Sequence, residues 1–337
     1  MKTLILGGSV FVGKRMVKTL IEAGHEVTVL NRGKTPVELP EGVDLIVADR
    51  TDAESMRAGL ANTEWDAVFD ISGFVMAAGG SDAESLIDLL DGKVGHYVYT
   101  SSIMAYEQGL GTFPWREEDP SSTEGPETYG GFKAKMETLL VKQYGENGFP
   151  ATIIRPAAIY GPDNNIYDME TPMFLRLQQG KPILVPHSGL VTMSYGHVDD
   201  LCEAMLASVG NSKALGEIFN ICAEAVTVDE YVRVLADITG CQANVISVPD
   251  NIIPTLTQPA WGHLFSKFHH GILDIGKASR LLDVNPRFDF RVGHEDTFTW
   301  FKEQGWEGRT EPLIDKTWMS SWNFDYEAEI AAQIQAL

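Results

Sequence analysis

Short apolar runs alternate with longer amphipathic stretches through the first half of the chain. The apolar runs predict strands at residues 3–6, 26–30, 44–48, 67–69, 96–100 and 151–154. The stretches between them predict helices at residues 11–23, 53–61, 82–90 and 127–144. Near-continuous apolar strands are typical of parallel sheets covered on both faces, so the pattern predicts a doubly wound α/β fold.

The pattern changes after Pro162, where loop-like segments replace the regular alternation. Residues 191–221 then carry a strand, a helix and another strand, which predicts that this stretch rejoins the sheet. We therefore expect two domains. The larger sheet domain is expected at residues 1–162 and 191–223, and a smaller domain at residues 163–190 and 224–337.

Composition and charge narrow the class of protein. The 337 residues are 44% hydrophobic, which is ordinary for a globular protein and ample for a core without metal or disulfide staples. The net charge of −21 makes a surface that repels phosphate backbones, so we expect no nucleic-acid partner.

The cysteines, the histidines and the N-terminal residues indicate reduced thiols, no metal site and a cytoplasmic location. The cysteines, at positions 202, 222 and 241, are too widely spaced for a zinc site or disulfide framework, so buried reduced thiols are expected. The histidines lack metal-ligand spacing with a carboxylate, and we expect no metal. No apolar run approaches ~18 residues and no signal-peptide pattern is present, which favours a cytoplasmic protein without a membrane partner.

A glycine-rich turn joins the first predicted strand to the first predicted helix. Its glycines let the backbone approach a pyrophosphate, whose charge the free N–H groups of a helix N-terminus stabilise. The context predicts a dinucleotide site in a Rossmann-type fold, the alternative being a tight turn without ligand. The turn residues expected to bind the cofactor are Gly7, Ser9, Val10, Phe11, Val12 and Gly13.

The end of the second predicted strand indicates which dinucleotide binds. NAD-binding folds place a carboxylate there for the ribose hydroxyl, whereas this chain has Asn31, Arg32 and Lys34. Two cations suit a 2′-phosphate, so we expect NADP, with NAD as the alternative. These cations could also belong to a solvated basic turn that binds no ligand. Asp49 is expected either to accept a hydrogen bond from adenine or to cap a helix, and Arg50 is expected among the cofactor-binding residues.

Three further residues predict acid–base chemistry. Tyr129 and Lys133 lie one helical turn apart, so their side chains share a face. An ammonium beside a phenol lowers the phenol's pKa from ~10, which makes tyrosine a usable general acid or base. Ser102 follows the fifth strand, and active groups gather at the carboxyl ends of such strands.

Taken together, these motifs resemble the extended short-chain dehydrogenase/reductase superfamily, the NAD-dependent epimerase/dehydratase group. The segments that carry the likeness are the glycine turn, Thr100-Ser101-Ser102 with Tyr106, Tyr129-x-x-x-Lys133 with Glu137, Arg155-Pro156 through Pro162, and His197-Val198-Asp199-Asp200-Leu201. The resemblance implies a Rossmann domain, a substrate-binding domain, a nicotinamide cofactor and the catalytic set Ser102, Tyr129 and Lys133. It also implies that Pro156 and Ala157 line the nicotinamide end of the site. Ser72 is expected among the cofactor-binding residues, although the turn at residues 70–74 departs from the family pattern.

Some residues depart from the family pattern. Val10 replaces the usual second glycine, and the turn is closer to a sub-branch that includes chloroplast stem-loop RNA-binding proteins. Met193, where nucleotide-sugar epimerases often carry arginine, removes an obvious diphosphate ligand. Ile103 and Met104 stand where dehydratases often carry acidic residues, which disfavours 4,6-dehydration.

We therefore expect an NAD(P)-dependent oxidoreductase or epimerase that acts on a sugar-like hydroxyl or ketone. The alternative is a non-catalytic or RNA-binding member of the same fold, and a dinucleotide-binding redox sensor is a third reading. The resemblance also implies a homodimer formed through helices 82–90 and 127–144.

Overall fold

A computed structural model describes residues 1–33, 38–72, 83–164, 169–257, 260, 265, 268–309 and 323–336. The chain divides into two compact units. Unit 1 comprises residues 1–157, 198–222 and 273–286, and unit 2 comprises residues 158–197, 223–272 and 287–337.

Unit 1 is built on a parallel sheet. Among its described residues seven strands pair in the order β10-β6-β5-β4-β1-β2-β3. The strands are β1 (Lys2–Leu6), β2 (Glu26–Asn31), β3 (Asp44–Val47), β4 (Ala67–Asp70), β5 (Tyr97–Thr100), β6 (Ala151–Pro156) and β10 (Ile218–Ile221). Order 3-2-1-4-5-6 is the Rossmann order, and it puts a change of winding direction between β1 and β4. The carboxyl ends of these parallel strands share one edge of the sheet, and folds of this type bind ligands at that edge, where the winding direction changes.

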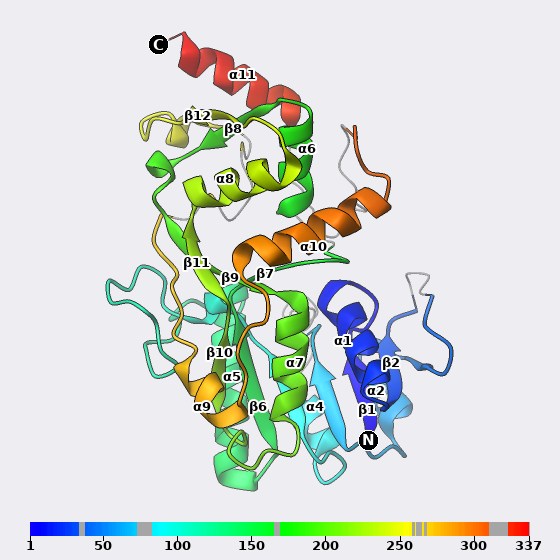
Figure 1. Ribbon diagram of the computed structural model, residues 1–337. Helices are drawn as coiled ribbons and strands as arrows, with labels where there is room; N and C mark the ends of the chain where they lie inside the picture. Colours follow the sequence, from blue (N-terminus) through cyan, green and yellow to red (C-terminus); the bar gives the residue numbers. More distant parts are fainter. Residues whose placement is uncertain are drawn as a thin grey trace. The chain divides into compact units, whose positions relative to one another are not determined.

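Helices cover both faces of this sheet (Figure 1). They are α1 (Phe11–Glu22), α2 (Ala53–Leu60), α4 (Ala83–Leu90), α5 (Tyr129–Asn147), α7 (Val198–Ser208) and α9 (Gly276–Leu282), with a short 3-10 turn η1 (Ile103–Ala105) after β5. Side chains of α2, α4 and α5 share one core cluster with the strands. Helix α7 packs against α1 and α9. The strands of the middle of the sheet are therefore fully buried, as their apolar sequences require.

Unit 2 combines small sheets with helices. Strands β7 (Ala158–Tyr160), β9 (Thr192–His197) and β11 (Glu224–Thr227) form one sheet, and β8 (Pro182–Val185) pairs with β12 (Asn244–Ser247). The helices are α6 (Glu170–Gln178), α8 (Val228–Thr239), α10 (Phe290–Glu303) and α11 (Phe324–Gln335), with 3-10 turns η2 (His187–Gly189) and η3 (Ile253–Thr255). Helices α6, α8 and α10 pack on one another.

The predicted Rossmann-type sheet is confirmed, and its strands and helices begin and end within three residues of their predicted bounds. The prediction that the whole stretch 191–221 rejoins this sheet is wrong. Strand β9 pairs with β7 and β11 instead, and only β10 joins the parallel sheet. Residues 158–162 and 191–197 accordingly group with unit 2, while residues 273–286 group with unit 1 because α9 packs on α7 and β10.

The cysteines are free thiols; Cys202 and Cys222 are buried and Cys241 is half-buried. Across the described ranges, no helix combines the length and the apolar composition needed to span a bilayer.

Candidate active site

The glycine turn between β1 and α1 is a tightly packed backbone cradle. Gly7 has a φ of +100°, a backbone conformation that residues other than glycine rarely adopt. A Cβ on Gly13 would lie 1.9 Å from the carbonyl oxygen of Gly7, and a Cβ on Gly7 would lie 2.5 Å from Cβ of Ser72. Both positions therefore require glycine, and the turn can present bare backbone to a ligand.

The start of α1 offers backbone donors. Val10 is the N-cap residue, and no described side chain caps this helix end. Val10 itself is 48% exposed, and Phe11 has a φ of +40°. Uncapped N–H groups at a helix N-terminus are a site for an anion such as a pyrophosphate, so Ser9, Val10, Phe11 and Val12 lie where a dinucleotide would pass.

The end of β2 is held against this turn. Asn31 Nδ2 donates to Ser9 Oγ at 3.1 Å, and Asn31 Oδ1 accepts from the Gly33 amide at 2.9 Å. Arg32 is exposed next to them. Lys34, the second predicted 2′-phosphate ligand, lies outside the described residues.

Two residues after β3 have mainly structural partners. Asp49 accepts from both the amide and the hydroxyl of Thr51, while α2 is capped by Asp52. Arg50 is buried and donates to both oxygens of Asp70, at 2.7 and 2.9 Å. That Arg50 contacts the cofactor stays a prediction, and in the structure its guanidinium binds Asp70.

The Arg50–Asp70 pair braces the cradle. Arg50 also donates to Ser72 Oγ at 2.8 Å, and Ser72 is the residue against which Gly7 packs. Tyr97 Oη donates to Asp70 at 2.5 Å. Burial alone would raise the pKa of Asp70, but the Arg50 guanidinium lowers it, so this carboxylate stays charged inside the protein.

The predicted catalytic residues meet at the carboxyl end of β5. Ser102 follows that strand, and Tyr129 opens α5 one turn before Lys133. Lys133 is buried; its Nζ donates to the carbonyl oxygen of Thr100 at 2.6 Å and lies 5.6 Å from the ring centroid of Tyr129. The chain thus folds these three residues together from two distant segments.

The pKa values differ from the expectation in one respect. Burial raises the pKa of Tyr129 although 38% of its surface is exposed, and hydrogen bonding to Ser102 partly opposes this shift. The predicted lowering of the Tyr129 pKa by Lys133 is therefore wrong: burial dominates, and the Lys133 ammonium donates to the Thr100 carbonyl oxygen. Burial instead lowers the pKa of Lys133 to about 8, although Asp70 and Glu137 favour its charged form.

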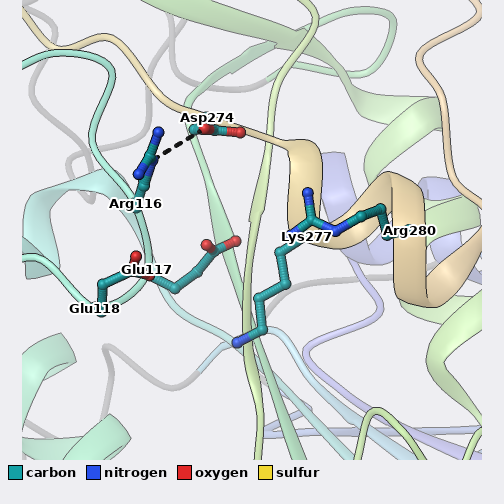
Figure 2. Close-up of a pocket in the computed structure, with 6 residues that line it drawn as sticks. All are labelled: Arg116, Glu117, Glu118, Asp274, Lys277 and Arg280. Atoms are coloured by element: carbon teal, nitrogen blue, oxygen red, sulfur yellow. Dashed lines mark hydrogen bonds and ion pairs between the residues drawn. The ribbon is translucent and has the colours of Figure 1, made fainter.

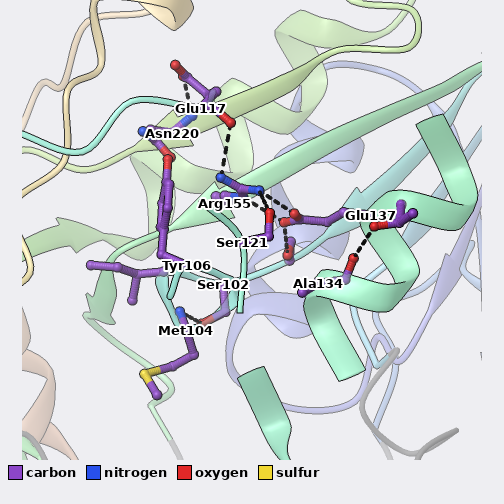
Figure 3. Close-up of polar contacts among 12 residues, drawn as sticks. Ser102, Met104, Tyr106, Glu117, Ser121, Ala134, Glu137, Arg155 and Asn220 are labelled. Atoms are coloured by element: carbon purple, nitrogen blue, oxygen red, sulfur yellow. Dashed lines mark hydrogen bonds and ion pairs between the residues drawn. The ribbon is translucent and has the colours of Figure 1, made fainter. Parts of the chain in front are cut away.

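A second buried network lies behind Ser102 (Figure 3). Glu137 accepts from the Ser101 hydroxyl and from two nitrogens of Arg155, the Nε contact being 2.8 Å. Arg155 also lies 4.2 Å from the Tyr106 ring centroid. The network holds the end of β5 against α5 and β6.

The same network continues to β10. Tyr106 Oη donates to Asn220 Oδ1 at 2.9 Å, and the Asn220 amide donates to Glu117 at 2.9 Å. Pro156 ends β6, and Ala157 is buried next to it with its amide bonded to Ile221. Sequence reasoning assigned no role to Asp70, Asn220 or Glu117, because their partners are far away along the chain.

The cradle fits a dinucleotide. Its glycines leave no room for a Cβ, and α1 begins uncapped within the described ranges. By contrast, the described residues hold no cluster of three or more histidine, cysteine or acidic side chains suited to a metal ion.

Comparisons with known proteins agree with this geometry. The model of the NAD dependent epimerase/dehydratase family matches residues 3–222. A chloroplast stem-loop binding protein of 41 kDa from Arabidopsis thaliana is 32% identical over 88% of this chain and 78% of that protein. A UDP-N-acetyl-alpha-D-glucosaminuronate decarboxylase from Bacillus cytotoxicus is 27% identical over 90% of this chain and 98% of that protein.

Solved structures share the fold. The UDP-glucose 4-epimerase of Thermotoga maritima, solved with UDP-glucose, superposes with a TM-score of 0.76 at 23% identity over 90% of this chain and 99% of that chain. A dTDP-glucose 4,6-dehydratase from Bacillus anthracis, in complex with NAD, gives 0.76 at 17% identity over 91% and 98%. The family match covers most of the chain, including the cradle and the segments that carry Ser102, Tyr129 and Lys133. The chain therefore belongs to the NAD dependent epimerase/dehydratase family.

Proposed function

We propose that the protein is an NAD(P)-dependent oxidoreductase or epimerase acting on a hydroxyl or ketone of a sugar-like substrate. The observation that carries the proposal is the meeting of Ser102, Tyr129 and a buried Lys133 at the end of β5, in the unit that also holds the glycine cradle. A lone cradle supports binding only, whereas these three side chains supply a proton donor or acceptor beside it.

Each residue has a distinct part. The cradle and the start of α1 would hold the pyrophosphate, and the bound nicotinamide would supply hydride exchange. Tyr129 Oη exchanges a proton with the substrate oxygen, and Ser102 orients that oxygen. Lys133 is the charge that favours the Tyr129 phenolate once its contact with Thr100 is exchanged for a ligand hydroxyl.

The substrate class rests on relatives. Proteins similar to this chain are named for UDP- and dTDP-sugars, so nucleotide sugars are the first compounds to assay. Met193 stands where many such enzymes have a diphosphate-binding arginine, which keeps other sugar-like alcohols in the panel. The homodimer and the cytoplasmic location stay predictions.

Replacing Tyr129 tests the mechanism. Tyr129→Phe removes only the hydroxyl, so we expect turnover of an identified substrate to fall by about 10²–10⁴-fold while dinucleotide affinity stays within about twofold. Steady-state assays and calorimetric titration measure the two quantities. Full activity in the variant would refute the proposed proton transfer.

Replacing Arg32 tests the cofactor preference. Arg32 is exposed at the end of β2, where an arginine can contact a 2′-phosphate. Arg32→Ala is expected to reduce the ratio of NADP to NAD affinity by about tenfold. An unchanged ratio would remove Arg32 as a determinant of cofactor choice.

RNA binding is the second candidate. One observation favours it: the 32% identity to a chloroplast stem-loop binding protein. The net charge of −21 opposes it, since affinity for RNA depends largely on neutralising phosphates. A gel-shift titration with a stem-loop RNA at physiological salt decides: tight, salt-sensitive binding would rank this function first.

A further inference from the structure

We infer that unit 1 carries a second ligand site, for a small phosphorylated polyol such as a sugar phosphate, beside the edge strand β10. A cavity of ≈320 Å³ lies there, lined by Arg116, Glu117, Glu118, Asp274, Lys277 and Arg280 (Figure 2). This volume is near the lower end of small-molecule sites and suits a monosaccharide-sized ligand rather than a dinucleotide. The inference does not depend on the proposed function.

Uncommitted groups in the cavity favour an anion. Asp274 already accepts from Arg116 Nε at 3.3 Å and from the Gly276 amide at 2.7 Å, and Glu117 accepts from the Asn220 amide. Arg280 has no hydrogen-bond or ion-pair partner among the described residues. Arg116 uses one nitrogen on Asp274 and is 62% exposed, so its outer nitrogens can still donate.

Glu118 and Lys277 indicate which groups the ligand carries besides its phosphate. Glu118 has no partner within the described part of the chain and is exposed, so it can accept from a hydroxyl. Lys277 pairs with Glu217 at 2.7 Å and lies 5.1 Å from the Phe219 ring centroid, which fixes its stem at the cavity wall. Arginine forks suit phosphate, and carboxylates suit hydroxyls.

The two segments that line the cavity are connected through Asn220. Asn220 Nδ2 donates to the carbonyl oxygens of Trp115 and Asp274, at 3.1 and 3.2 Å. Trp115 also forms a bridge with Leu273. The main chain on both sides of the cavity is thereby tied to one buried side chain, so the main chain needs less ordering when a ligand binds.

Calorimetric titration with glucose 6-phosphate, without turnover, tests the site. We expect one-to-one binding that weakens with salt, and a loss of about tenfold or more in the double variant Arg116→Ala/Arg280→Ala. Arg57→Ala, an exposed arginine on α2 of the same unit, is the matched control and should bind as the wild type does. Thermal unfolding of each variant checks that the fold is intact.

Other ligands separate the possibilities. Glucose should not bind, and inorganic phosphate should bind more weakly than the ester because it lacks hydroxyls for Glu118. Equal affinity for inorganic phosphate would show that the site does not recognise the hydroxyl groups of a polyol. Binding of glutamate in place of the ester would show that the site is not specific for phosphate esters. Absence of binding, or wild-type affinity in the double variant, would overturn the site itself, whatever the catalytic assays show.

Discussion

Each unit contains a buried arginine–glutamate pair, and the two pairs have different surroundings. In unit 1 Arg155 and Glu137 are 1% and 2% exposed, and in unit 2 Arg176 and Glu327 are 3% and 1% exposed. Glu137 also binds the Ser101 hydroxyl, next to the catalytic Ser102 that we propose. Within the described residues, Arg176 is the only side chain that hydrogen-bonds the Glu327 carboxylate, and this pair joins α6 to α11.

The comparison indicates that a buried arginine–glutamate pair can either position neighbouring polar groups or simply join two helices. Desolvating two charges costs several kcal/mol, and a bidentate contact largely offsets this cost. The pair in unit 1 extends into hydroxyls, a ring and a main-chain carbonyl, whereas the pair in unit 2 packs on the Phe324 ring, 5.4 Å from the guanidinium. We expect the first to affect catalysis and the second to affect only stability.

Removing one partner should have the largest effect. Glu137→Ala and Glu327→Ala each leave a buried guanidinium unpaired and should cost about 3–5 kcal/mol of stability. Hydrogen exchange should increase in α5 and β6 for the first variant, and in α6 and α11 for the second. A loss of protection in the same segments for both variants would contradict the distinction between the two pairs.

Replacing both partners by apolar residues sharpens the comparison. Arg176→Met/Glu327→Leu should change the free energy of unfolding by less than about 2 kcal/mol, because no other polar side chain of the described residues hydrogen-bonds to the pair. Arg155→Met/Glu137→Leu should cost about 1–3 kcal/mol more, because the Ser101 hydroxyl loses its acceptor. Urea unfolding measures both, and equal costs would remove the network as the reason.

Acid should weaken unit 2 through His294. This ring is fully buried, stacks on Tyr160 and has a pKa lowered to about 3 by burial. The pKa of His294 in the folded protein lies below its unfolded value. Its contribution to the free energy of unfolding is therefore complete above pH 6.5 and falls by roughly 1.4 kcal/mol per pH unit between pH 6.5 and pH 3.

The matched variant is His294→Phe, which should flatten this dependence in unit 2 only. His96 of unit 1, whose pKa burial lowers to about 4, should keep its own acid sensitivity of the same sign. Thermal unfolding followed from pH 7 to pH 4.5 provides the measurement. An unchanged slope in the variant would show that His294 does not control it.

An exposed ion pair should have the smallest effect. Lys142 and Glu146 lie on α5, as Glu137 does, but are 61% and 60% exposed and 3.8 Å apart. Lys142→Met should change stability by no more than ~0.5 kcal/mol. A cost approaching that of Glu137→Ala would mean that burial is not what distinguishes the pairs.

Local patterns in the sequence were sufficient for the sheet and not for the networks. Apolar runs and helical spacing depend on neighbouring residues, so the first six strands and the placement of Tyr129 and Lys133 on one helix could be predicted. The pairing of β9 with β7, and the burial of Arg50 on Asp70, depend on contacts between distant segments. Lys133 turns to Thr100, which no spacing rule foresees. The helices of unit 2 beyond residue 241 were missed because the pattern there is irregular.

The most direct test of the central claim is calorimetric titration of the protein with NADP and with NAD. The cradle predicts one-to-one binding of at least one dinucleotide, abolished in Gly13→Ala, whose Cβ would lie 1.9 Å from the Gly7 carbonyl oxygen. Gly145→Ala is the matched control, because this helical glycine has open space around it. Retained binding in the control and loss in Gly13→Ala, with both variants folded, is the predicted result. Absence of binding of either dinucleotide to the wild type would contradict the account.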